Sequence, residues 1–194
     1  DPKKVQEIKK DLVSKGVKYI YSNWIDFLGS PKTKPMPISD FEDLCSGKGP
    51  QFAVHSVSFV PELTPADNDQ IPVPDLDSLV ICPWDKTCAW VFADLWWNDK
   101  PYDVCPRQTL KKQIHKNAKA DLKFYVGIEP EFFLMKWEDG KPVKAIDNDP
   151  IPLRRQAFGY DAEYSIDGMN FLKEVINILN NDLHWDLHDV VAEG

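Results

Sequence analysis

The stretch VGIEPEFFLMKW, residues 126–137, places two acids inside an otherwise apolar and aromatic run. β-Branched and aromatic residues favour a strand, and successive side chains of a strand point to opposite faces of its sheet. Glu129 and Glu131 are therefore predicted to share one face, with their Cβ atoms about 7 Å apart, while Pro130 lies on the other. Because burying an unpaired carboxylate costs several kcal/mol, the fold must offer this face water or positive charge.

Two explanations of this carboxylate pair stay open from strand geometry alone. The first is structural: a strand face in contact with solvent, or salt bridges to lysine or arginine. The second is a divalent cation site, since Mg²⁺ and Mn²⁺ take hard oxygen ligands and are often held by carboxylates together with substrate phosphates.

The composition predicts a globular protein that binds neither nucleic acid nor a membrane. A hydrophobic content of 43% over 194 residues is enough for a substantial core, in one medium domain or two small ones. The 31 acids against 23 bases give a formal net charge of −8, without a basic stripe that could neutralise a phosphate backbone. No apolar run approaches the roughly 20 residues of a membrane helix, and the charged N-terminal segment has no signal-peptide pattern. We expect a cytoplasmic protein.

The two ends and the cysteines add two expectations. The chain begins with Asp1 in place of methionine and stops within DLHDVVAEG, which has strand composition, so we expect a piece of a longer protein. The cysteines lack C-x-x-C spacing and are predicted to be small buried hydrophobes, with a disulfide framework or zinc site as the weaker alternative. They are Cys45, Cys82, Cys88 and Cys105.

Helices and strands are both predicted, which gives an α+β chain, with α/β as the open alternative for its second domain. Helices are expected from the cap Asp1-Pro2 to Gly16, over 39–44, from Pro106 to the turn at 120–121, and over 166–179. Strands are expected as a hairpin over 17–38 with its turn near 26–30, weakly over 51–60, then at 80–82, 88–97, 126–137 and 184–193, with a hairpin turn at 138–140. Residues 61–79 hold four prolines and five acids and are expected to form an ordered surface loop. A domain boundary is predicted near 102–106.

Five motifs along the chain point to one family. They are DFLGSPKTK at 26–34, DNDQIPVPDLDSLVICPW at 67–84, CPRQTLKK at 105–112, GIEPEFFL at 127–134 and VVAEG at 190–194. Together they resemble the glutamine synthetase superfamily. They correspond in order to its N-terminal hairpin, its acidic proline-rich loop, the start of its interdomain helix, its Glu-x-Glu strand, and a strand with a further metal-binding glutamate.

The resemblance implies a two-domain enzyme. Residues 1–104 would form an N-terminal β-grasp domain, and residues 105–194 the beginning of a catalytic domain built from an antiparallel sheet with helices. Such enzymes are ATP-dependent ligases that phosphorylate the γ-carboxylate of glutamate, after which ammonia or an organic amine attacks the acyl phosphate. They assemble as homo-oligomeric rings. This chain would hold only part of the enzyme and would be inactive by itself.

The resemblance also implies a metal site. By carry-over, Glu131 and Glu193 would bind one Mg²⁺ or Mn²⁺ ion, and Glu129 the other. The remaining ligands, like most groups that bind ATP and glutamate, would lie beyond residue 194. Two metals meet a physical need, because anionic nucleotide and anionic glutamate must approach each other while charge develops on the transferred phosphoryl group.

One departure from the family concerns the nitrogen donor. Ammonia-using members carry an aspartate where QFAVHSVSF, residues 51–59, has Ala53. This favours an organic amine as donor, with glutamine synthesis from ammonia and a non-catalytic structural member as alternatives. His55 in this segment is a weaker candidate for amine contact, and a metal site at His184 and His188, aligned with Asp186 on a strand, is weaker still.

Overall fold

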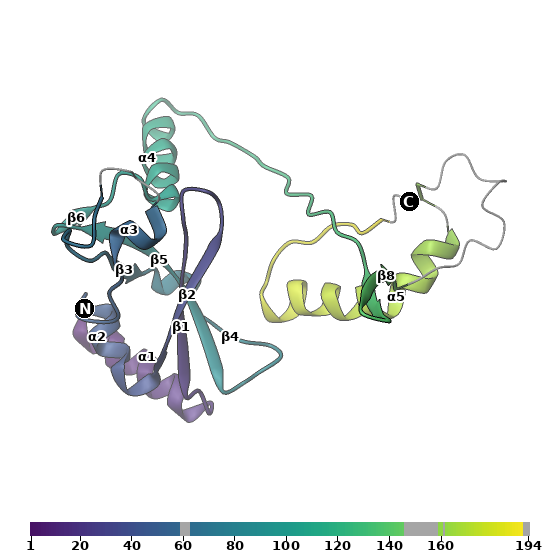
Figure 1. Cartoon of the computed structure of the whole chain (residues 1–194), viewed down its shortest axis with the longest axis horizontal. Coiled ribbons are helices and arrows are strands. Elements are labelled where there is room, and N and C mark those ends of the chain that lie inside the picture. The colour runs from purple at the N-terminus through teal and green to yellow at the C-terminus, as the bar shows by residue number, and fades with distance from the viewer. Residues whose placement is uncertain (59–62, 146–158, 161, 192–194) are drawn as a thin grey trace. The chain divides into compact units, whose positions relative to one another are not determined.

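The computed structural model describes residues 1–58, 63–145, 159–160 and 162–191 of the chain, in two compact units, Asp1–Phe124 and Tyr125–Gly194 (Figure 1). The boundary between the two units therefore lies after the end of α4 (Pro106–Lys119). The first turn of this helix packs on the sheet of the first unit. The domain division at 104/105 remains a prediction. None of the helices in the described part of the chain combines the length and the apolar character that crossing a membrane requires.

The first unit contains a mixed sheet of six strands (Figure 1). The strands are β1 (Tyr19–Ile25), β2 (Pro31–Pro37), β3 (Ile71–Pro74), β4 (Val80–Ile81), β5 (Cys88–Trp97) and β6 (Lys100–Pro101). Their main order is β2-β1-β5-β3, and both β4 and β6 also pair with β5. β1 runs parallel to β5, whereas every other pairing is antiparallel. The mixture of helices and strands predicted from the sequence is confirmed at this level.

The predicted N-terminal helix and hairpin are both present. α1 (Pro2–Ser14) begins at Asp1, whose side chain accepts a hydrogen bond from the backbone N–H of Lys3, and Gly16 follows its end with a φ of +89°. Asp1 therefore caps the helix, and glycine takes the left-handed conformation without the steric cost of a Cβ atom. β1 and β2 pair from Tyr19–Pro37 to Ile25–Pro31, which places the hairpin turn where the sequence predicts it.

The core of the first unit consists of two clusters. One joins α1, α2 (Phe41–Cys45), β1 and β5 through buried apolar side chains, which include Leu12, Ile20, Phe41, Leu44 and Val91. The other lies farther along β5 and consists of Trp24, Val54, Leu95, Tyr102 and Cys105. Along most of β5 the side chains alternate between fully and partly buried, as they do in a strand with one face on the core.

Two expectations for residues 51–79 are wrong in part. The weak strand predicted over 51–60 contains α3 (Val54–Ser58) instead, and Phe52 forms an isolated bridge with Gln70; residues 59 and 60 lie outside the described part. The predicted loop contains β3 and a 3-10 turn, Leu76–Ser78. Among the described strands, β3 pairs with β5 alone, at the end of the main strand order, and an edge strand tolerates proline because its outward N–H groups need no partner.

The second unit contains a short hairpin and a helix. β7 (Met135–Glu138) pairs with β8 (Lys141–Lys144) across a turn at Asp139 and Gly140, which have φ values of 50° and 74°. Two consecutive positive φ values are typical of a type I′ turn, so the predicted hairpin turn is confirmed. α5 (Ala162–Asn177) confirms the predicted C-terminal helix, and a π-helical segment, Ile178–Asp182, continues it.

Two strands predicted for the second unit are not formed as expected. Of the run 126–137, only the end belongs to a strand, β7, and residues 125–134 have no regular secondary structure. Residues 184–191 of the second predicted strand also lack it, while 192–194 lie outside the described residues. A strand requires a neighbour that satisfies its backbone N–H and C=O groups, and no ladder pairs with either segment in the part of the chain that the structure describes.

Candidate functional site

The carboxylate pair lies on the non-helical segment that precedes β7. Glu129 and Glu131 are both exposed, as are the apolar side chains around them; Ile128 and Phe133 are each 83% exposed. Neither glutamate forms an ion pair or a hydrogen bond with another described residue. Salt bridges within the described part of the chain therefore do not explain the pair, and both carboxylates are open to solvent or to a ligand.

The third predicted ligand, Glu193, lies outside the described residues. Within the described residues, no three His, Cys, Asp or Glu side chains come together in a way that could hold a metal ion. The alignment of Glu129 with Glu131 on one strand face is also absent, because this segment is not a strand. The metal site at these three glutamates thus remains a prediction.

A buried aspartate organises the hairpin turn between β1 and β2. Asp26 is 3% exposed, and its Oδ1 accepts hydrogen bonds from the backbone N–H groups of Leu28 and Ser30 at 2.9 and 2.8 Å. The Nζ of Lys32 lies 3.4 Å from Oδ2. Burial raises the pKa of the Asp26 carboxyl, but the hydrogen bond from Ser30 and the Lys32 cation outweigh it, so that the net pKa is lowered. Asp26 is therefore ionised at neutral pH, and its carboxylate stabilises the turn by accepting these hydrogen bonds.

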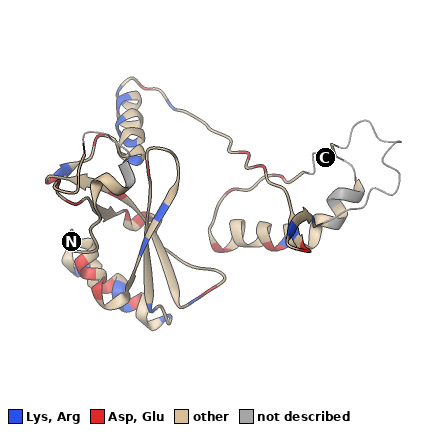
Figure 2. Ribbon diagram, viewed as in Figure 1, with Lys and Arg blue, Asp and Glu red and all other residues tan. Residues whose placement is uncertain are grey.

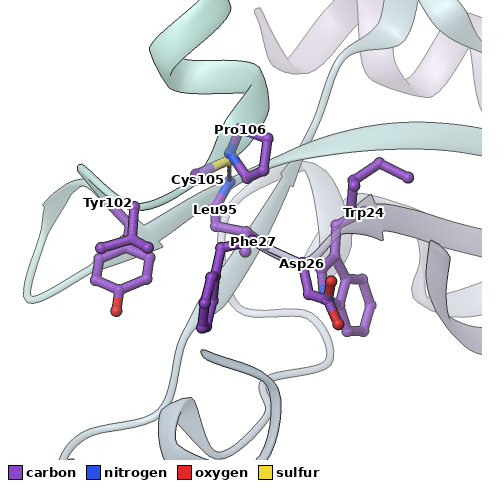
Figure 3. A pocket seen from close by; sticks show the side chains of 9 residues that line it. Trp24, Asp26, Phe27, Leu95, Tyr102, Cys105 and Pro106 are labelled. Atoms are coloured by element: carbon purple, nitrogen blue, oxygen red, sulfur yellow. Dashed lines mark hydrogen bonds between the residues drawn. The ribbon is translucent and has the colours of Figure 1, made fainter. Parts of the chain in front are cut away.

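A small cavity lies beside this turn (Figure 3). Trp24, Asp26 and Phe27 border it from β1 and the turn, while Tyr102, Cys105 and Pro106 border it from the segment that leads into α4. Its volume is about 10 Å³, which accommodates roughly one water molecule and no amino acid or nucleotide. The Nε1 of Trp24 has no hydrogen-bond partner among the described residues, whereas its ring stacks on Phe52 at 4.2 Å.

A four-membered charge network joins the start of α4 to the sheet. Arg107 donates from Nε to Asp94 at 3.1 Å and from a terminal nitrogen to Asp75 at 2.6 Å. Lys111, one turn later, bonds to the same two carboxylates at 2.5 and 3.2 Å. The guanidinium of Arg107 also lies 5.6 Å from the centre of the Phe92 ring. Figure 2 shows α4 as a helix rich in lysine and arginine, and these two residues direct part of that charge toward the sheet.

The network shifts the pKa values of its members. Burial raises the pKa of Asp75, but hydrogen bonding and charge from Lys111 and Arg107 outweigh this, and the net pKa is lowered. The hydrogen bond to Asp94 raises the pKa of Lys111. The sequence contained a partial signal for this network, because Asp75, Arg107 and Lys111 fall within motifs quoted above, whereas Asp94 lies in the strand predicted over 88–97. Its geometry was not predicted, because Asp75 and Arg107 are 32 residues apart.

The histidine candidates are separate from these features. His55 lies on α3, a helix where a strand was expected. Its side chain is partly buried, and its Nε2 lies 3.5 Å from the hydroxyl of Ser56. His188 pairs with Asp186 at 3.4 Å on an exposed segment, and His184 has a φ of +56°. The strand alignment that would have placed His184 beside the other two is therefore wrong.

The four cysteines are free thiols. Cys82, Cys88 and Cys105 are buried and Cys45 is partly buried. The prediction that the cysteines are small buried residues is thus confirmed for these three, whereas Cys45 is only partly buried.

The class of protein follows from comparison with known sequences. A family model described as "Glutamine synthetase, catalytic domain" matches residues 103–193, a range that contains all three predicted metal ligands. The chain belongs to the glutamine synthetase superfamily.

The particular relatives carry two different names. The glutamine synthetase of Rhizobium meliloti (strain 1021) is 36% identical over 138 residues, which cover 71% of this chain and 31% of that protein. The glutamate–methylamine ligase of Methyloversatilis universalis is 31% identical over 147 residues, which cover 75% of this chain and 33% of the ligase. The chain thus spans about a third of the length of these curated relatives.

Solved structures show the fold. The structure titled "GmaS/ADP complex-Conformation 1" matches with a TM-score of 0.77 and 22% sequence identity, over 95% of this chain and 41% of that one. "Apo GmaS without ligand" matches with the same TM-score and 21% identity. At this level of identity the likeness concerns the fold alone.

Proposed function

We propose that this chain is part of an ATP-dependent ligase that joins glutamate to an amine through a γ-glutamyl phosphate. The observation that carries the proposal is a pair of exposed carboxylates, Glu129 and Glu131, which form no ion pair with another described residue. Both lie inside the range that matches the catalytic-domain family model. Relatives named glutamine synthetase and glutamate–methylamine ligase support this reaction class. Glutamate, ATP and ammonia or an organic amine would be the substrates.

The donor chemistry of the site fits a divalent metal. Carboxylate oxygens are the ligands that Mg²⁺ and Mn²⁺ prefer, and Glu129 and Glu131 have no protein cation among the described residues that would compete. Glu131 together with Glu193 would hold one ion, and Glu129 would hold another with groups from the rest of the enzyme. When bound, such ions neutralise the negative charge of ATP and glutamate as the phosphoryl group is transferred.

The larger architecture proposed follows the superfamily. Residues 1–104 would form a β-grasp domain, and residues 105–194 the beginning of a catalytic domain with an antiparallel sheet. The uncovered apolar side chains of residues 124–137 are consistent with a strand that gains its neighbours from the rest of the enzyme. A ring-shaped homo-oligomer in the cytoplasm would be the working form.

An organic amine is the proposed nitrogen donor. Ala53 stands immediately before α3, where ammonia-using members of the family carry an aspartate. A methyl group cannot attract ammonium, so the electrostatic reason for ammonia selectivity is missing at this position. The likeness to a glutamate–methylamine ligase supports the same choice. The second candidate is glutamine synthesis from ammonia, which the 36% identity to a glutamine synthetase favours.

The test uses the full-length enzyme with glutamate, ATP and Mg²⁺. Phosphate release is measured with ammonia, methylamine and ethylamine in parallel, and the amide product is identified by mass spectrometry. Higher kcat/KM with an alkylamine than with ammonia supports the proposal. Turnover with ammonia and none with alkylamines would identify a glutamine synthetase. The absence of metal-dependent turnover with every amine would instead favour a non-catalytic member.

A further inference from the structure

Two cysteines face each other across the β4–β5 hairpin. β4 pairs with β5 through Val80–Trp90 and Ile81–Ala89, and the backbone N–H of Cys82 donates to the carbonyl of Cys88 at 2.9 Å. Cys82 is therefore directly opposite Cys88 in the same antiparallel register. Directly opposed residues have Cα atoms about 4.5–5.5 Å apart, which falls within the roughly 4.4–6.8 Å that a disulfide spans.

Both cysteines are buried, and the surroundings of Cys82 keep it in the thiol form. Cys82 and Cys88 are 5% and 6% exposed, and the thiol of Cys88 donates to a carboxylate oxygen of Asp85 at 3.2 Å. Burial, with smaller contributions from the neighbouring Cys88 and Asp85, raises the pKa of the Cys82 thiol to about 11. Little thiolate of Cys82 is therefore present at neutral pH, and its reaction should be slow.

We propose that Cys82 and Cys88 are a dithiol that a small peroxide such as hydrogen peroxide converts to an intramolecular disulfide. One sulfur attacks the peroxide, the O–O bond breaks, and a sulfenic acid and one water form as the thiol proton is transferred. The second thiol attacks this sulfur, the S–O bond breaks, and the S–S bond forms with release of a second water. Two thiols lose two electrons in total, and the peroxide is reduced to two waters.

The disulfide would restrain the hairpin turn. The ring that it closes contains Trp84, which is 64% exposed and whose ring centroid lies 5.2 Å from that of Trp90 on β5. The reduced turn has no covalent link across its base and is held by non-covalent contacts, among them the hydrogen bonds that Asp85 accepts from Thr87. A covalent bond across the base of the turn limits the conformations open to Trp84, and a dithiol such as dithiothreitol reverses it.

The other two cysteines provide matched controls. Cys105 lies on the segment before α4, where its sulfur accepts the backbone N–H of Leu95 at 3.5 Å, and Cys45 ends α2. Neither is opposite another cysteine in the described sheet pairings. A reaction specific to the opposed pair should therefore spare both.

The experiment treats the full-length protein with hydrogen peroxide, unfolds it in the presence of N-ethylmaleimide, and maps the tryptic peptides. Lys86 lies between the two cysteines, so trypsin separates them unless a disulfide joins the fragments. We expect a Cys82–Cys88 cross-linked peptide, loss of both alkylated forms, unchanged labelling of Cys45 and Cys105, and recovery of all four labels after dithiothreitol.

Cys82→Ser should lack the cross-linked peptide, whereas Cys45→Ser should form it as the parent does. The map of the parent protein decides the matter even if the Cys82 variant does not fold. Full alkylation of both cysteines after peroxide, sulfinic acids in place of the cross-link, or disulfides that involve Cys45 or Cys105 would each overturn the proposal.

Discussion

The Nε of Arg107 donates a hydrogen bond to Asp94 at 3.1 Å, which ties the first turn of α4 to the middle of β5. The same guanidinium bonds to Asp75 at 2.6 Å, so one side chain joins three segments that are distant in sequence. Both bonds are charge-assisted and partly shielded from solvent, since Asp94 and Arg107 side chains are 14% and 26% exposed. Hydrogen bonds of this kind contribute more than neutral ones.

Arg107→Ala should therefore destabilise the protein by about 2 kcal/mol, measured by urea unfolding. The matched control is Lys112→Ala, which removes an exposed ion pair with Asp103 and should cost less than about 0.5 kcal/mol. Arg107→Lys should recover only part of the loss, because an ammonium cannot reproduce the planar fork that reaches two carboxylates. Equal stability of the two alanine variants would contradict a special role for Arg107.

The same network predicts how stability varies with pH. The pKa of Asp75 in the folded protein is lowered below its ordinary value of 3.8, so its contribution is complete above pH 3.8 and is lost as the pH falls through the folded pKa. The pKa of Lys111 is raised above 10.5, so its contribution is complete below pH 10.5 and is lost as the pH rises through the folded pKa. The pKa of Asp26 is also lowered, so its contribution to stability is likewise lost in the acidic range, as the pH falls through the folded pKa.

The contribution of this network to the free energy of unfolding should therefore be nearly constant between about pH 4 and 10. Outside this window the contribution should decrease. Asp75→Asn should show a shallower decline between pH 4 and pH 2 than the parent, since it removes one titrating group. An identical acid slope in the two proteins would show that Asp75 does not contribute. Asp40→Asn is a suitable control, because Asp40 is exposed on the surface.

Gly49 is required by close packing against α2. A Cβ atom at this position would lie 2.6 Å from the Cα of Leu44 and 3.0 Å from its backbone nitrogen. Backbone atoms of a buried residue cannot move away as the end of a flexible side chain can, so Gly49→Ala should cost about 1–3 kcal/mol. Gly127→Ala is the control, since a Cβ atom there meets nothing within 4 Å. Thermal unfolding of the two variants measures the difference, and equal midpoints would refute it.

Glu131→Ala tests the proposed metal site in the full-length enzyme. We expect metal-dependent turnover to fall by more than about 100-fold, because loss of even the outer partners of metal ligands commonly costs 10–100-fold. Mg²⁺ titration should show weakened metal dependence beside the loss of rate. The control is Glu138→Ala, since Glu138 is exposed on β7 and forms an ion pair with Lys136 at 3.8 Å. Unchanged rates in Glu131→Ala would exclude the role.

Local patterns predicted much of the fold. The cap at Asp1, the turn at Asp26, the start of α4 at Pro106 and the turn at Asp139 are all present where the sequence places them. Each depends on interactions within a few residues, which the sequence shows directly. For the candidate site, the sequence singled out Glu129 and Glu131 together with the family, and the family assignment is confirmed.

Strand pairing was less predictable. Residues 71–74 form a strand despite two prolines because β5 provides a partner at the edge of the sheet, whereas 125–134 have strand composition and no ladder among the described residues. Residues 54–58 form a helix although their composition favoured a strand. For the first two segments, the presence or absence of a pairing partner distant in sequence therefore mattered more than local preference.

The sequence by itself determined the helix caps, the hairpin turns and the superfamily, because these depend on short-range chemistry and on residue identity at a few positions. Only the tertiary structure decided that Arg107 and Lys111 share Asp75 and Asp94, and that Cys82 is opposite Cys88. The physical reason is that ion pairs and sheet registers depend on where distant segments meet. That meeting is governed by the burial of the whole apolar core, and no short stretch of sequence records it.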